Sequence, residues 1–388
     1  MPNTTQQISG LNPKGKYILS VIAKRTYEIN PNGNCKLHEV QDDIIEDHVM
    51  SDDVEGLFTH DIDVYPCKPL TDIILKGVAR SDKNVKHFSA SIELGRLAMK
   101  YEIFADRKVH KNLKGGYIFS NESKISEVPL LYTNAYGGMD LKAEKQIRAA
   151  LKDKESLKYA DEVLDIFSGS PYRYPRNPLG KGYVIEATPE TISELSLPNI
   201  ENPSQLLTPD NFICNDVLEW YKMPVPRGTD WIHPGWFPRV AYFGNYALPK
   251  GLNENIYEIK NNLVDKSILK SSPNPRIDAF NFSACNGASL GLQSKLISSG
   301  GQQCRLTNIH PHRKDFIFTL PNEIPNIKVD GRNGKLLNTD PLIQTILIEP
   351  ELKKLTIVWR GSGKALRPYT PEELKTMPYE VTWPEKFT

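Results

Sequence analysis

The sequence predicts a mainly β protein, with antiparallel sheets packed as sandwich-like layers, long proline-rich loops and few short helices. Segments near both ends of the chain alternate polar and apolar residues with a period of two, which is typical of strands with one buried face. Prolines crowd the middle of the chain from Pro171 to Pro238. Each fixes its own φ and removes an N–H, so this part forms loops and short strands. Only residues 141–167 show a sustained helical period.

The first predicted element is a hairpin over residues 16–40. Lys16–Ile29 is rich in Tyr, Ile and Val, and Asn30–Asn34 is a dense turn signal. Cys35–Val40 is then the returning strand. The acidic stretch that follows, residues 41–55, is typical of a solvated loop or a short helix.

A three-stranded meander is predicted between residues 57 and 104. Its strands are Thr71–Ala79, Lys86–Leu94 and Leu97–Phe104, and the turn between the last two is Gly95-Arg96. Their alternation of polar and apolar residues predicts a sheet with one exposed face.

The helical period of Leu141–Phe167 predicts one helix, or two helices broken near residues 153–156. It divides the chain into an N-terminal β-rich region (1–140), a helical insertion (141–170) and a loop-rich and β C-terminal region (171–388). We expect the two β regions to pack as one large unit.

The C-terminal third returns to strand patterns. Gln303–Ile309 and Asp315–Leu320 form one predicted strand pair, and Leu342–Ile348 and Lys354–Arg360 form another. Near the end, Thr370-Pro371-Glu372-Glu373 is a capping box with proline at the first helical position, which predicts a short helix that ends before Pro378.

Composition excludes several classes of function. The chain of 388 residues has 48 Lys and Arg against 47 Asp and Glu, so it lacks the basic excess of a nucleic-acid binder. No run approaches the roughly 18 apolar residues of a membrane helix, and the polar N-terminus has no secretory h-region. The five cysteines are scattered, which predicts free thiols in a reducing cytoplasm.

The sequence contains partial motifs for catalysis, metal binding and phosphate binding, but each lacks residues that the chemistry requires. Gly287–Gly291 matches the nucleophile-elbow pattern, but no Asp or Glu lies between Ser289 and His310, so the order of acid and histidine fails. His310 and His312 are separated by a proline, which favours a turn over a metal site. Gly361–Lys364 lacks the residues that complete a phosphate-binding loop. We therefore expect no catalytic residues, no metal and no cofactor.

The stretch from Met223 to Phe243 combines prolines with aromatic residues, and arginines gather around it. A rigid aromatic segment either packs over other elements or forms a binding surface, in which Trp, Tyr and Arg are strong contact residues. Alternatively, the arginines hydrogen-bond loop carbonyls, because irregular buried backbone needs donors. The candidate partner-binding residues are Arg173, Arg176, Arg227, Trp231, Trp236, Arg239 and Tyr242.

Two further functions stay open from the residues alone. A hydrolase acting on cell-wall or glycan material would use paired carboxylates and a histidine, for which Asp61, Asp63, Asp230 and His233 are the candidates. A carbohydrate-binding protein would use Trp231, Trp236 and Tyr242 as stacking platforms.

Several fragments, taken in order, resemble a bacterial family of unknown-function domains that is found beside type VI secretion effector genes. Proteins of this family are described as accessory or adaptor proteins. The resemblance runs from about residue 60 to 361. Its fragments are Lys68–Ala79, Phe104–Arg107, Val128–Tyr132, Ala135–Asp140, Asn177–Tyr183, Leu197–Pro203, Trp236–Arg239, Ile348–Pro350 and Val358–Gly361.

The resemblance implies a cytoplasmic adaptor or chaperone that is not an enzyme. Its partner would be a toxin effector or a PAAR-like spike-tip protein, which it would stabilise and help to load on the secretion spike; no nucleic acid or membrane is implied. The shared fragments rest on Gly, Pro, Asn and aromatic residues. Physically, these predict loop architecture, with glycines for positive φ and Asn177 and Asn199 for loop hydrogen bonds.

Overall fold

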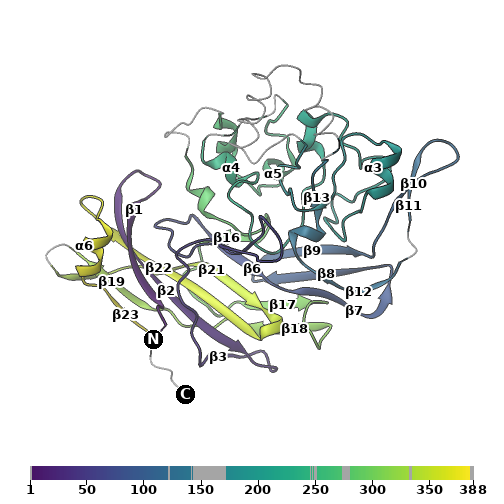
Figure 1. Cartoon of the computed structure of the whole chain (residues 1–388). Coiled ribbons are helices and arrows are strands. Elements are labelled where there is room, and N and C mark those ends of the chain that lie inside the picture. The colour runs from purple at the N-terminus through teal and green to yellow at the C-terminus, as the bar shows by residue number, and fades with distance from the viewer. Residues whose placement is uncertain are drawn as a thin grey trace.

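The computed structural model describes residues 2–120, 123–140, 142, 172–244, 246, 248, 251–272, 280–331 and 334–384. Figure 1 shows two large sheets and, beside them, a loop-rich region that carries most of the short helices. The mainly β prediction is confirmed. Within the described residues, no helix is both long and apolar enough to cross a membrane. The predicted helix of residues 141–167, and with it the insertion, lies outside the described residues except for Lys142.

The first sheet has seven strands and mixes the two ends of the chain. Its central pair, β2 with β22, is antiparallel from Ile18 opposite Lys364 to Glu28 opposite Lys354. In spatial order the strands are β1 (Thr5–Leu11), β2 (Tyr17–Ile29), β22 (Lys354–Lys364), β21 (Leu342–Glu349), β6 (Leu70–Leu75) and β16 (Gln293–Lys295), with β3 (Cys35–Leu37) also paired to β2.

The second sheet has five strands and lies against the first. Its β8–β9 hairpin turns at Gly95, whose φ of 59° suits glycine. In spatial order the strands are β15 (Ile200–Glu201), β9 (Leu97–Phe104), β8 (His87–Leu94), β17 (Gln303–Thr307) and β18 (Asp315–Thr319).

Shorter elements complete the fold. The small sheets are β20 (Leu336–Asn338), β19 (Asn326–Asp330) and β23 (Glu380–Thr382); β10 (Val109–Lys111) and β11 (Tyr117–Phe119); β12 (Ile125–Pro129) and β7 (Val78–Val85); β13 (Tyr136–Gly137) and β14 (Lys181–Gly182); and β4 (Val49–Met50) and β5 (Phe58–His60). The helical segments are η1 (Tyr132–Asn134), α3 (Pro189–Glu194), η2 (Val217–Lys222), α4 (Arg239–Tyr242), α5 (Tyr257–Lys260), η3 (Lys266–Lys270), η5 (Phe282–Cys285), η6 (Pro350–Leu352) and α6 (Pro371–Thr376).

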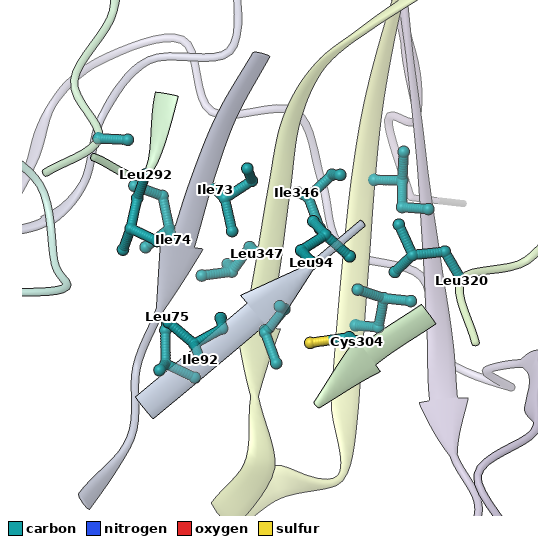
Figure 2. Close-up of a cluster of buried hydrophobic side chains, with 14 of the residues drawn as sticks. Ile73, Ile74, Leu75, Ile92, Leu94, Leu292, Cys304, Leu320, Ile346 and Leu347 are labelled. Carbon is teal, nitrogen blue, oxygen red and sulfur yellow. The ribbon is translucent and has the colours of Figure 1, made fainter. Parts of the chain in front are cut away.

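The main hydrophobic core fills the space between the two large sheets. Figure 2 shows Ile346 of β21 in one cluster with Ile92 of β8 and Cys304 of β17. All three side chains are fully buried. Strands β9, β17 and β18 send every second residue into this core, as the sequence pattern predicts, whereas β6 and β21 place consecutive residues in it.

Four predicted strand pairings are confirmed: β2 with β3, β8 with β9, β17 with β18, and β21 with β22. The predicted meander is wrong in its first strand. The segment from Thr71 to Ala79 divides into β6 and β7, and β6 joins the other sheet, where it pairs parallel to β21. The reason is burial on both faces, since Ile73, Ile74 and Leu75 have no exposed surface.

The core predicts a large cost for truncating Ile346. Replacing Ile346 with Ala removes buried methyl groups and leaves a cavity, so we expect the free energy of unfolding to fall by about 2–5 kcal/mol. Urea denaturation followed by far-UV circular dichroism measures it. The matched control is Leu352→Ala, at a leucine that is 63% exposed in a turn at the end of the same strand pair. An Ile346→Ala midpoint equal to that of the control would contradict this packing.

Candidate functional site

The arginines predicted to bind a partner are largely used inside the protein. Arg176 is 2% exposed and forms an ion pair with Glu258, which is fully buried. Its Nε donates to Oε1 of that carboxylate at 2.5 Å and its Nη2 to Oε2 at 2.8 Å. Its Nη1 donates to the Tyr174 hydroxyl and to the carbonyl oxygen of Met223, and its Nη2 also donates to the carbonyl oxygen of Tyr221. Arg176 therefore holds η2 and α5 together.

Arg239 forms a second buried centre, at the start of α4. Its Nη1 lies 3.0 Å from the carboxylate of Asp61, and its Nε and Nη1 donate to the carbonyl oxygens of Ala284 and Ile232. His48 and Tyr65 contact the other carboxylate oxygen of Asp61 at 3.0 and 3.1 Å. Although burial alone would raise the pKa of Asp61, the Arg239 charge holds it well below its usual range.

The other two arginines are half-buried. Nη2 of Arg227 donates to Oδ1 of Asn202 at 2.9 Å. The backbone of Arg173 forms a bridge with Met139. The Arg227 side chain thus holds the loop that carries Asn202, and the Arg173 backbone holds its segment to Met139.

The three predicted aromatic contact residues are also buried. Trp231, Trp236 and Tyr242 are 3%, 4% and 5% exposed. Trp236 packs edge-on against Tyr132, with ring centroids 5.5 Å apart, and the Tyr242 hydroxyl accepts a hydrogen bond from the backbone N–H of Asp265. These rings have no open face for a sugar, so the carbohydrate-binding alternative loses the residues on which it rested.

The four residues of the hydrolase alternative share no hydrogen bond or ion pair with one another in the described structure. Asp61 pairs with Arg239, and Asp63 pairs with the buried Lys24 at 2.8 Å. Burial raises the pKa of Asp230 to about 7, and burial lowers the pKa of His233 to about 4. Among the described residues, no group of three or more His, Cys, Asp and Glu side chains is placed to hold a metal ion.

Five of the fragments that carried the family resemblance meet in one junction beside the second sheet. Nδ2 of Asn177 donates to the carbonyl oxygens of Tyr132 and Tyr136. Lys181 and Asn199 hydrogen-bond at 2.9 Å, and Asn199 continues to the carbonyl oxygen of Phe104. The expected loop roles of Asn177 and Asn199 are confirmed.

Glycine is required at the centre of this junction. Gly137 has a φ of 151°, and a Cβ built there would lie 2.1 Å from the carbonyl oxygen of Asn177. The neighbouring Gly138 and Gly182 also have positive φ, as the sequence predicts. The junction is a rigid framework of packed backbone.

An open groove of about 700 Å³ lies along β1, an edge strand of the seven-stranded sheet. β1 forms the floor of the groove. One wall comes from the loops before β6 and the other from α6 and the chain around it, which Figure 1 shows beside β1. The lining residues are Asn3, Thr5, Gln6, Gln7, Ile8, Ser9, Glu46, Val64, Pro66, Tyr369, Pro371, Leu374, Lys375 and Tyr379.

The α6 wall is built by interactions that the sequence largely encodes. The predicted capping box is present, because the Thr370 hydroxyl and the Glu373 side chain each accept a hydrogen bond from the other residue's backbone N–H. The buried side chain of Gln7 then donates to the carbonyl oxygens of Leu374 and Met377 at the C-terminal end of α6. This contact fixes α6 against β1.

Sequence reasoning missed the groove because it missed β1. Thr5–Leu11 is mostly polar and has one central apolar residue, Ile8, so its alternation is weak. Ile8 packs towards Ile44 and Val64, while Gln7 points to α6. The one sequence signal for this site was the capping box. It predicts a helix near the end of the chain but does not predict which element that helix packs against.

The buried ion pair of Arg176 predicts a large effect of neutralising its partner. Glu258→Gln leaves the guanidinium charge uncompensated in the interior, so we expect the free energy of unfolding to fall by about 3–5 kcal/mol. Urea denaturation measures it. The control is Glu219→Gln, in the exposed Lys222–Glu219 pair, which should leave the midpoint unchanged. The prediction fails if the two variants behave alike.

Asp230 predicts a pH dependence of stability. Its folded pKa of about 7 lies above the ordinary value, so the folded state keeps a proton that the unfolded state releases. Stability should therefore be full at about pH 4 and fall as the pH rises towards about 7. Asp230→Asn has no carboxyl group to ionise, so its free energy of unfolding should not fall over this pH range. Above about pH 7 the variant should be more stable than the wild type by at most about 4 kcal/mol. Urea denaturation at a series of pH values tests it; parallel curves for the two proteins would refute it.

Comparisons with known proteins give one match. A family model described as "uncharacterized protein conserved in bacteria (DUF2169)" matches residues 14–360. The comparison with curated proteins and the comparison with solved structures each gave no match. The match includes the Gly137 junction and both large sheets apart from β1 and the last four residues of β22, and it leaves out β1 and α6. The chain thus belongs to the DUF2169 family of proteins conserved in bacteria.

Proposed function

We propose that this protein is a cytoplasmic adaptor or chaperone that holds another protein in the groove along β1. The observation that carries the proposal is the groove itself, which is long, open and lined by mixed side chains. Tyr369, Tyr379 and Leu374 lie on its α6 side, and aromatic side chains of this kind anchor protein interfaces. On the opposite wall, Val64 and Pro66 supply apolar surface.

The family resemblance of the sequence is the basis for proposing a particular partner. We propose that it is a type VI secretion effector or a PAAR-like spike-tip protein, which the adaptor stabilises and helps to load. Membership of a bacterial family is compatible with this role. The extensive use of buried arginines as internal braces also supports a scaffold, because a rigid framework presents its edge strand in a fixed geometry.

The proposal predicts that a bulky charge in the groove releases the partner. Tagged full-length protein is returned to the cytosol of its own bacterium, and the proteins that stay bound are identified by mass spectrometry. We expect wild type to retain an effector or spike-tip protein. Val64→Arg places a charged side chain on the groove wall, so recovery should fall by about tenfold or more.

The matched control is Leu352→Arg, which adds the same side chain at an exposed leucine outside the groove lining. It should retain the partner. Equal thermal melts would show that both variants are folded. Recovery that is the same for both variants, or a wild type that retains no protein, would argue against the proposed function.

A further inference from the structure

The backbone of β1 offers an unpaired row of hydrogen-bonding groups to the groove. Two hydrogen bonds at the ends of the β1–β2 pair fix which backbone groups of β1 face β2 and which face outward. Lys24 N–H donates to the Thr4 carbonyl oxygen, and Asn12 N–H donates to the Lys16 carbonyl oxygen. In the same antiparallel register, Gln6 lies opposite Ile22 and Ile8 opposite Ser20. Even-numbered residues therefore bond to β2, and the N–H and C=O groups of the odd-numbered residues point outward.

The outward groups belong to Thr5, Gln7, Ser9 and Leu11. In the described structure, the one contact to them is a long one, from the Tyr379 hydroxyl to the Thr5 carbonyl oxygen at 3.5 Å. The walls reach β1 through side chains instead: Tyr369 N–H donates to the Ser9 hydroxyl, and Gln7 donates to α6. The walls thus stand beside the edge and leave its backbone open along the groove.

We infer that the groove binds an extended segment of the partner protein, which adds to β1 as a further strand of the seven-stranded sheet. This inference rests on the proposed adaptor function and specifies how its site works. A row of alternating donors and acceptors is matched by another polypeptide backbone, as in other proteins that bind peptides at a sheet edge. From Thr5 to Ser9 the floor is roughly 14 Å long, enough for about five paired residues.

The two walls define the side chains of the bound segment. On β1, Thr5, Gln7 and Ser9 contact the α6 side, whereas Ile8 packs against the same buried cluster as Val64. Because an added strand alternates in the same way, its side chains face the two walls in turn. Apolar residues suit Leu374 and Tyr369 on the α6 wall, where Lys375 favours an acidic neighbour. On the other wall, Glu46 favours a basic one.

A second copy of this chain is a poorer occupant. Both copies would carry the β1 edge between two walls, so their edges would be held apart by α6 and by the loop that contains Val64. A free extended segment has no walls of its own and reaches the floor. The geometry therefore favours a flexible tail or linker of the partner.

Proline substitution at Ser9 tests the strand pairing. Ser9→Pro removes one outward N–H and leaves the β1–β2 ladder intact, because the Ser9 N–H does not bond to β2. The matched control, Ser9→Ala, loses the same hydroxyl contact with Tyr369 but keeps the N–H. The probe is a peptide selected on the full-length protein from a library of random peptides of about twelve residues. By fluorescence anisotropy, its Kd should rise at least about tenfold with Ser9→Pro and change little with Ser9→Ala.

Hydrogen exchange on the wild-type protein gives a readout that needs no variant. In the free protein, the outward amides of Gln7 and Ser9 should exchange fast, while those of Gln6 and Ile8, bonded to β2, are protected. Binding of the selected peptide should slow the exchange of the Gln7 and Ser9 amides and leave the exchange of the Gln6 and Ile8 amides unchanged. This pattern of alternate residues is specific to a strand added at the edge.

The results that would contradict strand addition at β1 differ from those that would contradict the adaptor function. A selected peptide that binds Ser9→Pro as well as wild type, or that leaves Gln7 and Ser9 exchanging fast, would overturn strand addition. So would a library that yields no binder. Sedimentation of a wild-type dimer that Ser9→Pro converts to a monomer would assign the edge to a second copy and overturn it too. In each case, loss of the cytosolic partner in Val64→Arg would leave the adaptor function standing.

Discussion

The structure depends on one constraint: backbone carbonyls buried in the loop-rich region have no partner in a strand or helix and need hydrogen-bond donors from side chains. The described parts of residues 130–140 and 172–292 have no long strands or helices, yet many of these residues are buried. Each buried carbonyl needs a donor, and an unsatisfied one would cost about 1–3 kcal/mol. Arg176, Arg239 and Asn177 supply these donors from side chains. The price of burying the two guanidinium groups is offset by the carboxylates of Glu258 and Asp61.

This solution explains why residues that look suited to binding lie inside the protein. Arginine has five donors in a fixed fork, so one side chain can brace several loop carbonyls at once. Tryptophan and tyrosine fill the spaces between loops that have no regular periodicity of their own. The same residue types are favoured at protein interfaces, and therefore composition alone could not separate a braced loop region from an exposed contact surface.

The structure has two parts, a packed framework and the groove along the edge strand β1. The framework comprises the second sheet, the first sheet without β1 and the junction around Asn177 and Gly137, and nearly all of it lies within the family match. The groove along β1 takes its floor and its α6 wall from residues outside that match. The Gln7 contact that docks α6 joins the two parts.

Local patterns in the sequence determined a large part of the fold. Turn residues at Asn30–Asn34 and at Gly95 specified two hairpins, and the Thr370 capping box specified α6, because these signals act between neighbours in the chain. Tertiary structure alone decided the rest. The parallel pairing of β6 with β21 and the position of β1 at an open edge depend on which distant segments bury a common face, and local alternation carries no record of that choice. The groove exists because α6 and β1, from opposite ends of the chain, meet through Gln7.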